Sequence, residues 1–365
     1  MQPLADFLAA VRPPSTPALI VRRAALDANI AVLQAACDAA GVRLRAHGKM
    51  HKCSTLGRAQ VADGAIGLCC QTVGEAEAFA RGGIADLLVT SPPPAWGWAR
   101  LAAVAGQART AAVIDSARQV ALAQAAAAAA GVTLGIVIDV DPGMQRTGVA
   151  PGEVAALVGQ VRAAPHLRYD GIQCYAGNLQ HIADRTARAA ANAAATAVLR
   201  TLVAALDAAG LAPPVVTGGG TGTYALDLAA GVYTELQCGS YALMDIEYGD
   251  CDGPAGDWPF LPALFVAASI VSAHHASHVT CDAGLKAVST DGPPARVLVP
   301  GGATWRAFGD EHGAIAGDDL PGEGALVFLQ HGHCDPTINL YDALLVADED
   351  GELERWPVDA RRVTA

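Results

Sequence analysis

Short apolar segments alternate with longer alanine-rich segments along the chain up to about residue 250. Residues 27–40 carry apolar side chains at helical spacing and are followed by Gly41, a residue type that commonly ends a helix. Each later apolar segment is followed by an alanine-rich one, which predicts a helix because alanine is the best helix former. After a leading strand at 17–22, the predicted strands are residues 44–49, 66–70, 86–89, 110–114, 134–140, 167–175, 215–219 and 234–238.

Eight strand–helix units predict a (β/α)₈ TIM-like barrel, because an open parallel sheet would usually have fewer strands. In such barrels the reactive groups lie at the C-terminal ends of the strands. Beyond residue 250 the alanine-rich helices give way to alternating segments, which predict a smaller, mostly β domain. These segments are residues 264–272, 278–281, 295–299, 325–329, 340–346 and 353–358.

The change of pattern predicts three parts of the chain. We expect an N-terminal segment at 1–25 that packs with the β domain, a barrel at 26–252 and a C-terminal β domain at 253–365. The connector between Gly249 and Pro259 is rich in Gly, Asp and Pro, as linkers often are.

Composition narrows the class of protein. Of the 365 residues 52% are hydrophobic and 16% are charged, which is ample material for a core. The net charge of −12 argues against nucleic-acid or anionic-membrane partners, since no basic tract compensates for it. The apolar stretches are interrupted before they reach membrane-spanning length, and the N-terminus lacks a basic segment followed by an apolar run. Nine cysteines without a CxxC pair suit reduced thiols, so we expect a cytoplasmic protein.

A group of cations follows the apolar part of strand 44–49. His47, Lys49, His51 and Lys52 lie within six positions, in a chain with only 24 Lys and Arg against 36 Asp and Glu. Neighbouring cations favour the neutral form of a lysine, which is the form that Schiff-base chemistry needs. The group therefore predicts a reactive amine or an anion site, with a solvated basic turn as the alternative.

Other polar residues follow the later strands. Arg146 lies in a glycine-bracketed turn and could hold a phenolate or carboxylate. Tyr175 ends the predicted sixth strand and His181 follows it, and the two could form a general acid/base pair. The glycine-rich segments 217–223 and 237–241 follow strands seven and eight, where this fold commonly binds phosphate. Ordinary loop residues and tight turns are the alternatives, and neither a G-x-G-x-x-G after a first strand nor a P-loop is present.

The predicted β domain contains a possible metal site. His333 and Asp335 alternate with Cys334, so on an extended chain both would point to one side. A nitrogen and an oxygen ligand suit a divalent ion such as Mn²⁺ or Zn²⁺, and two ligands indicate an open site completed by water. The segment 310–312 is a second polar cluster that could face the same pocket. A surface polar turn is the alternative for each.

Taken in order, these motifs resemble the fold-type III pyridoxal phosphate enzymes, the family of alanine racemase. The resemblance is greater to its D-threonine aldolase branch, which includes D-3-hydroxyaspartate aldolase and D-serine dehydratases. The family usually has proline where this chain has Ala46. The matching segments extend over nearly the whole chain: 45–52, 69–77, 143–149, 171–175 with 180–181, 217–222, 232–241, 282–286, 310–313 and 333–337.

The resemblance implies roles for individual residues. Lys49 would form the Schiff base with pyridoxal phosphate, and Arg146 would contact the phenolic oxygen of the cofactor. Alanine racemases place an arginine against the pyridine nitrogen, where this chain has neutral Gln237, and this difference argues against a racemase. The full set of expected cofactor residues is Lys49, Arg146, Tyr175, Thr217, Gly219, Gly220, Thr221, Gln237, Gly239, Ser240 and Tyr241.

His333 and Asp335 match the metal pair of the aldolases, whereas the dehydratases tend to carry cysteine at the second position. The resemblance therefore implies an aldolase that cleaves D-3-hydroxy amino acids of the D-threonine type to glycine and an aldehyde. The expected ion is Mn²⁺, with Mg²⁺, Co²⁺ and Zn²⁺ as alternatives. It would lower the pKa of the β-hydroxyl group, and His181 or a metal-bound water would take the proton.

Three other functions remain open at this point. One is an aldolase for D-3-hydroxyaspartate that releases glyoxylate, and another is a dehydratase of D-serine or D-3-hydroxyaspartate. A non-catalytic pyridoxal phosphate carrier is the third, although such carriers resemble the barrel alone. The family resemblance also implies a head-to-tail homodimer with twofold symmetry.

Overall fold

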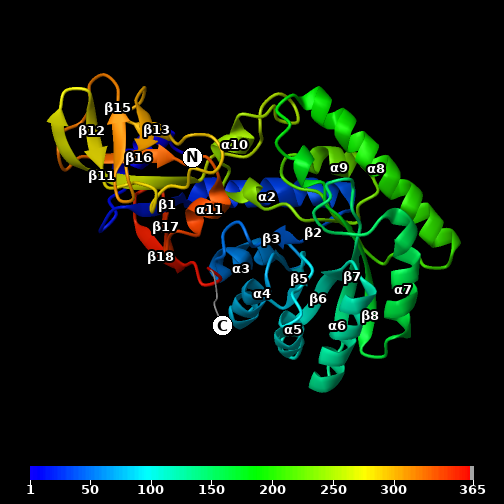
Figure 1. Cartoon of the computed structure of the whole chain (residues 1–365). Coiled ribbons are helices and arrows are strands. Elements are labelled where there is room, and N and C mark those ends of the chain that lie inside the picture. The colour runs from blue at the N-terminus through cyan, green and yellow to red at the C-terminus, as the bar shows by residue number, and fades with distance from the viewer. Residues whose placement is uncertain (362–365) are drawn as a thin grey trace. The chain divides into compact units, whose positions relative to one another are not determined.

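The computed structural model describes residues 1–361. The chain forms two compact units (Figure 1). The barrel unit comprises Leu33–Lys49 and Ser54–Gly239, and the β unit comprises Met1–Val32, Met50–Cys53 and Ser240–Arg361. Helix α2 (Arg23–Ala40) runs from the β unit into the barrel unit.

The strands of the barrel unit form a parallel sheet in the order β2-β10-β9-β8-β7-β6-β5-β4-β3. The two edge strands of this order, β2 and β3, are separated in sequence only by Arg45, so the sheet closes upon a single interrupted strand. The strands are β2 (Arg43–Leu44), β3 (Ala46–His47), β4 (Leu68–Cys70), β5 (Asp86–Val89), β6 (Arg109–Ile114), β7 (Leu134–Asp139), β8 (Leu167–Cys174), β9 (Val216–Gly218) and β10 (Glu235–Leu236). The predicted barrel is therefore confirmed.

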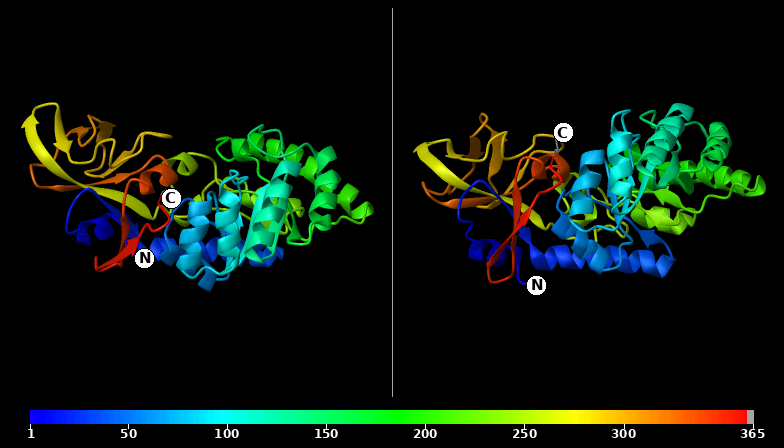
Figure 2. Two further views of the ribbon diagram at one scale, coloured as in Figure 1. Left: turned by 60° about the horizontal axis from the view of Figure 1, so that its bottom comes forward. Right: turned by 90° about the horizontal axis from the view of Figure 1, so that it is seen from below.

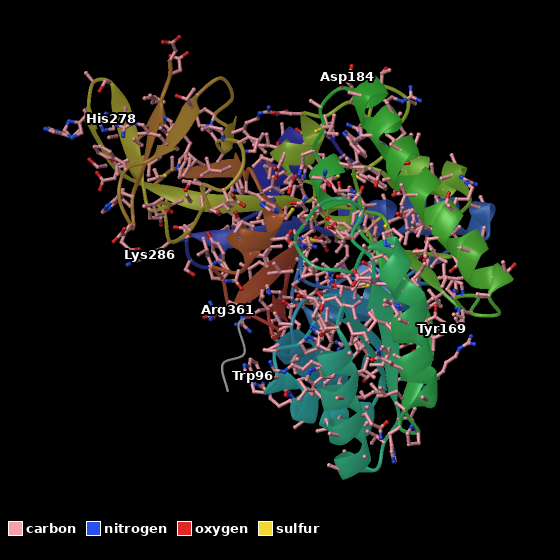
Figure 3. The ribbon with its side chains drawn as sticks, turned by 45° about the vertical axis from the view of Figure 1, so that its right-hand side comes forward. Trp96, Tyr169, Asp184, His278, Lys286 and Arg361 are labelled. Carbon is pink, nitrogen blue, oxygen red and sulfur yellow. The ribbon has the colours of Figure 1, made fainter. Side chains whose placement is uncertain are left out.

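Helices lie on the outside of these strands (Figure 1). They are α3 (Ser54–Ala62), α4 (Val73–Arg81), α5 (Gly97–Ala105), α6 (Ala117–Ala130), α7 (Val154–Ala163), α8 (Arg185–Ala208) and α9 (Tyr224–Ala230). Two short 3₁₀ turns, η1 (Pro151–Glu153) and η2 (Gly177–Leu179), lie in the segments after β7 and β8. Several begin at a side-chain cap: Thr72, Ser116 and Asp184 each accept a hydrogen bond from the backbone N–H three residues later. Asp184, labelled in Figure 3, is the cap of α8.

Helix α8 is long and apolar enough to cross a membrane by length and composition alone, which is weak evidence for such a role. Its buried residues recur every three to four positions and include Arg188, Asn192, Leu199, Leu202 and Leu206. This spacing is typical of a helix that covers a protein core with one face, and α8 packs against α9 and η2.

The N-terminal end of the barrel interior contains a buried arginine that forms two ion pairs. Arg45, between β2 and β3, donates to Asp86 at 2.7 Å and to Glu235 at 3.0 Å. Burial lowers the pKa of the Arg45 guanidinium, but the two carboxylates outweigh it and hold that pKa above its usual value. Arg45 therefore ties β5 and β10 to the interrupted strand at the N-terminal end of the barrel.

The β unit is built on a nine-stranded sheet in the order β12-β15-β14-β13-β16-β11-β1-β17-β18. Its neighbouring strands are antiparallel except for β1 and β17, which are parallel. The strands are β1 (Ala18–Arg22), β11 (Leu264–His275, the long yellow strand in Figure 2), β12 (His278–Cys281), β13 (Arg296–Val299), β14 (Thr304–Ala307), β15 (Gly313–Ala316), β16 (Leu326–Gln330), β17 (Ala343–Ala347) and β18 (Leu353–Pro357).

The core of the β unit joins both ends of the chain. Phe7 and Leu8 of helix α1 (Leu4–Ala10) pack with Ile20 of β1, Phe265 of β11 and Phe328 of β16. The other helices of this unit are η3 (Ser240–Ala242), α10 (Ile246–Gly249) and α11 (Cys334–Ile338). All nine cysteines of the chain are buried and unbridged.

Four differences from the predicted elements matter. The first barrel strand ends at His47, so Lys49 lies in the following turn rather than within the strand. Helix α2 begins at Arg23, four residues earlier than predicted, and Leu340 precedes β17 instead of belonging to it. Strands β14 and β15 were missed, because each has only four residues and lacks a clear apolar alternation. Pairing with neighbouring strands decides such short segments.

Candidate active site

Lys49 lies at the C-terminal end of the barrel, held by backbone bonds on both sides of its strand. The N–H of His47 donates to the carbonyl of Cys238 at 2.9 Å, and the N–H of Gly48 donates to the carbonyl of Cys69 at 2.8 Å. Lys49 itself is half-buried. Because Cys238 directly precedes Gly239, this pairing brings the Lys49 turn beside the glycine loop that follows β10.

The imidazole of His47 supports this turn. Its Nε2 lies 3.0 Å from the hydroxyl of Thr90, which donates to the carbonyl of Cys70 at 3.1 Å. The backbone N–H of Lys49 lies 3.4 Å from Nδ1 of His47. These contacts fit a neutral imidazole with its proton on Nε2. His47 is therefore a second residue of the cation group with a positioning role.

The glycine-rich loop after β9 has a backbone that only glycine readily adopts. Gly219 has φ +69°, and a Cβ there would lie 2.6 Å from a carboxylate oxygen of Asp227. Gln180 braces the same loop, since its Oε1 accepts from the N–H of Gly222 at 2.9 Å and its Nε2 donates to the hydroxyl of Thr223 at 3.0 Å. The buried amide of Gln180 thus links this loop to the segment that carries His181.

Asp227 lies beneath the loop as a buried carboxylate. It accepts hydrogen bonds from the hydroxyl of Thr223 and from the amide nitrogen of Asn192, each at 2.6 Å. Burial raises the pKa of Asp227 to about 6, against the lowering effect of these hydrogen bonds. Gly219, Gly220 and Thr221 are all buried above it. The loop after β9 is therefore a fixed structure rather than a surface turn.

Gln237 belongs to a hydrogen-bonded network of amides, a hydroxyl and carboxylates inside the barrel. Its Nε2 donates to Oε1 of Gln173 and to the hydroxyl of Thr217, both at 3.0 Å. Thr217 donates in turn to Glu235 at 2.9 Å, and Gln173 donates to Asp139 at 2.9 Å. Burial raises the pKa of Asp139 to about 6, although its hydrogen bonds oppose the shift. The network fixes the Gln237 amide at the ends of β8 and β10, and sequence alone did not reveal Gln173 as its partner.

Arg146 and Tyr175 come together after β7 and β8. The guanidinium of Arg146 lies 5.5 Å from the centre of the Tyr175 ring, which is within cation–π distance. Asp141 holds the turn before Arg146 by accepting from the N–H groups of Gly143 and Gln145, at 2.9 and 3.0 Å. His181 follows η2 and is exposed.

Ser240 and Tyr241 continue the chain after Gly239 and belong to the β unit. Both are buried in the short helix η3, and the Tyr241 ring packs against Phe260 with 5.7 Å between the ring centres.

His333 and Asp335 are brought together in the β unit, but not by the predicted extended chain. His333 caps the N-terminus of α11, so the alternation argument was wrong: residue 334 is already helical. Nε2 of His333 nevertheless lies 3.5 Å from a carboxylate oxygen of Asp335. On the other side of the ring, Nδ1 lies 2.8 Å from Asp291 and 3.8 Å from Glu247. Burial lowers the pKa of His333, but Asp335 and Asp291 raise it to about 9.

A second cluster lies on the buried side of the same segment. The ligand-type atoms of Asp245, His331 and Cys334 lie within 4.8 Å of one another, and all three residues are buried. Nε2 of His331 lies 3.1 Å from the sulfur of Cys334, whose N–H donates to Asp245 at 3.0 Å. Asp245 also caps α10 by accepting from the N–H of Tyr248. Nothing in the sequence near residue 333 indicated Asp245, because its partners are distant along the chain.

Comparisons with known proteins agree with this architecture. Residues 21–246 match the family model "Alanine racemase, N-terminal domain", and residues 263–347 match the model "Putative serine dehydratase domain". The chain therefore belongs to the alanine racemase-like, fold-type III family of pyridoxal phosphate proteins, in the branch of D-threonine and 3-hydroxy-D-aspartate aldolases.

Three relatives cover nearly the whole chain. A D-threonine aldolase of an Arthrobacter species is 39% identical over 95% of this chain and 92% of its own length. A 3-hydroxy-D-aspartate aldolase of Paracoccus denitrificans is 41% identical over the same shares. The crystal structure of a D-threonine aldolase from Filomicrobium marinum superimposes with a TM-score of 0.90 at 35% identity, covering 95% of each chain.

Proposed function

We propose that this chain is a pyridoxal phosphate- and divalent metal-dependent aldolase that cleaves D-3-hydroxy amino acids to glycine and an aldehyde. The observation that carries the proposal is the presence of two donor sets in one chain. The barrel has Lys49 together with two glycine loops that follow β9 and β10, and the β unit has the facing pair His333 and Asp335. The aldolase relatives align with 95% of the chain, so the alignment takes in both units.

The barrel residues fit the cofactor. Pyridoxal phosphate requires an amine for its aldehyde carbon and N–H donors for its phosphate. The barrel offers Lys49 in a turn next to the loop at Gly239, and the backbone of Gly219 and Gly220 in the loop after β9. Thr221 would add a hydroxyl donor. Arg146, held near Tyr175, would face the phenolic oxygen, and Gln237, fixed by Thr217, would face the pyridine nitrogen.

The donor set of the β unit fits a divalent ion. A 3.5 Å separation between Nε2 of His333 and the Asp335 oxygen leaves room for both atoms to bind one ion. One imidazole and one carboxylate suit Mn²⁺ better than a thiolate site would. The thiol of Cys334 faces His331 on the other side of the segment, and burial raises the pKa of Cys334 well above its usual value.

When bound, the pyridoxal ring supplies an electron sink and the ion lowers the pKa of the substrate hydroxyl. The chain's own residues bind and orient. Lys49 would hold the cofactor covalently between turnovers, the glycine loops would hold its phosphate, and His181 would take the proton from the β-hydroxyl oxygen of the substrate. With that proton removed, the Cα–Cβ bond of the substrate can break: the aldehyde leaves, the electron pair stays on Cα, and a proton returned to Cα gives glycine.

D-Threonine and D-3-hydroxyaspartate are both candidate substrates, because relatives of each name are about equally similar to this chain. A dehydratase is the second candidate function, and Asp335 at the second metal position disfavours it. As parts of the same proposal we infer Mn²⁺ as the ion, a homodimer, a cytoplasmic location, and the division into residues 1–25, 26–252 and 253–365.

The direct test is a product assay on the purified protein with pyridoxal phosphate and Mn²⁺. D-Threonine should give glycine and acetaldehyde in equal amounts, and D-3-hydroxyaspartate should give glycine and glyoxylate. The ratio of the two rates identifies the preferred substrate. A 2-keto acid with ammonia would identify a dehydratase instead, and no turnover of any D-3-hydroxy amino acid would refute catalysis.

A further inference from the structure

The metal pair of the β unit has a third partner that sequence did not indicate. Nδ1 of His333 lies 2.8 Å from Oδ2 of Asp291, whereas Nε2 points toward Asp335 at 3.5 Å. An imidazole that binds a metal ion is neutral: it gives the lone pair of one nitrogen to the ion and keeps its one proton on the other nitrogen. A bond from Nδ1–H to Asp291 therefore leaves the lone pair of Nε2 directed toward the Asp335 side.

The loop that carries Asp291 packs against residues 331–335, which are called the metal segment below because they include His333 and Asp335. Gly332 lies so close to this loop that a Cβ atom on residue 332 would overlap the carbonyl oxygen of Pro293. Asp291 itself is fixed by its N–H, which lies 3.1 Å from the hydroxyl of Ser289. The absence of a side chain at Gly332 thus lets the loop come close enough for Asp291 to reach His333.

A second carboxylate lies on the same side of the imidazole but outside hydrogen-bond distance. Oε2 of Glu247 is 3.8 Å from Nδ1 of His333. Its backbone N–H donates to the carbonyl of Gly332 at 3.1 Å, so α10 is also joined to the metal segment. Glu247 and Asp291 carry the same charge at different distances from Nδ1. Variants of the two residues therefore distinguish the effect of the hydrogen bond from the effect of nearby negative charge.

We propose that Asp291 is a positioning residue for the metal site, which fixes the tautomer and the orientation of His333 so that Nε2 binds the divalent ion. This role rests on the proposed metal dependence. Carboxylate partners of metal-binding histidines typically change metal affinity by about 10- to 100-fold when they are removed. Asp291 is an exposed side chain, so its removal leaves no cavity in the core.

The test measures the affinity of the pyridoxal phosphate-loaded protein for Mn²⁺ by calorimetry after removal of bound ions. Asp291→Ala should weaken binding by about 10- to 100-fold. Asp291→Asn keeps an acceptor oxygen and should retain much of the affinity. Glu247→Gln, which removes charge without removing this hydrogen bond, should change it by less than about threefold. Asp250→Asn is the matched control, because it breaks an exposed ion pair with Arg296 in the same unit.

The outcomes separate the positioning role from the proposed function. If Asp291→Ala binds Mn²⁺ as the unmodified protein does, the role of Asp291 is refuted while metal dependence stands. If Glu247→Gln or Asp250→Asn weakens binding as much as Asp291→Ala, a general loss of charge explains the effect and the role is also refuted. If the unmodified protein binds no ion and still cleaves substrate, both the role and the proposed metal dependence fail.

Discussion

The cofactor end of the barrel and the metal segment of the β unit hold their functional groups by different means. In the barrel, uncharged amides and hydroxyls do so: Gln180 braces the glycine loop, and Gln173 and Thr217 fix Gln237. In the β unit, a half-buried imidazole is set among the carboxylates of Asp291, Asp335 and Glu247. Salt should act mainly on the partly exposed charges of the β unit. A change of pH should act on both regions, because burial raises the pKa of Asp139 and of Asp227 in the barrel to about 6.

The comparison teaches that the two ligands should be removable one at a time. In the proposed enzyme, Lys49 holds the cofactor covalently among buried, hydrogen-bonded side chains of the barrel. The ion is bound by two side chains and by water molecules, so it can exchange with ions in the solvent. Each of the following changes should therefore affect one region and leave the other intact.

The largest effect is expected from Lys49→Ala. This change removes the amine that would form the Schiff base, so aldol cleavage and the absorption band of the protein-bound Schiff base should both disappear. The affinity for Mn²⁺ should remain that of the unmodified protein, because His333 and Asp335 belong to the other region. Retention of the Schiff-base band in this variant would assign the reactive amine to another lysine.

His181→Ala should reduce aldol cleavage by about 10²-fold or more, because a positioned general base contributes roughly that factor. The cofactor absorbance should not change, since His181 is exposed and lies outside the network of Gln237. Rates measured under saturating substrate test this. A variant with full activity would exclude the histidine and leave a metal-bound water as the base.

Gln180→Ala should weaken cofactor binding by up to about 30-fold, because it removes two buried hydrogen bonds of about 1 kcal/mol each from the glycine loop. Absorbance titration with pyridoxal phosphate measures the affinity. Gln124→Ala is a matched control, since Gln124 also accepts a backbone hydrogen bond in the barrel unit, from the N–H of His166. Equal losses in both variants would show a general destabilisation rather than a specific brace.

Asp227→Asn should have the smallest effect on activity and a distinct effect on the pH dependence of stability. Because the folded-state pKa of Asp227 is raised to about 6, its contribution to stability is full below the ordinary pKa near 3.8. That contribution is lost as the pH rises through about 6. When the pH rises from 4 to 8, the free energy of unfolding of the variant should therefore increase by up to about 3 kcal/mol relative to that of the unmodified protein. Urea unfolding at both pH values measures the difference, and parallel curves would refute the raised pKa.

The sequence predicted the barrel well because each strand and helix has its own local pattern. Strand β5 of the barrel has the predicted bounds, as does β12 of the β unit, and the strand-end motifs of the barrel lie at the expected edge of its sheet. The missed features depend on partners that are distant in sequence. Asp245 and Asp291 join the metal segment only through the folded β sheet, and Gln173 meets Gln237 only across the closed barrel. The contact of His333 with Asp335 was predicted from the wrong geometry.

The most direct measurement adds Mn²⁺ stepwise to the metal-stripped, pyridoxal phosphate-loaded protein while products and cofactor absorbance are followed together. Glycine and aldehyde should appear in equal amounts, in proportion to bound ion, and the protein-bound cofactor should remain at one per chain throughout. Cleavage that proceeds fully without the ion, or release of the cofactor when the ion is removed, would contradict the account of two separately held ligands in one aldolase.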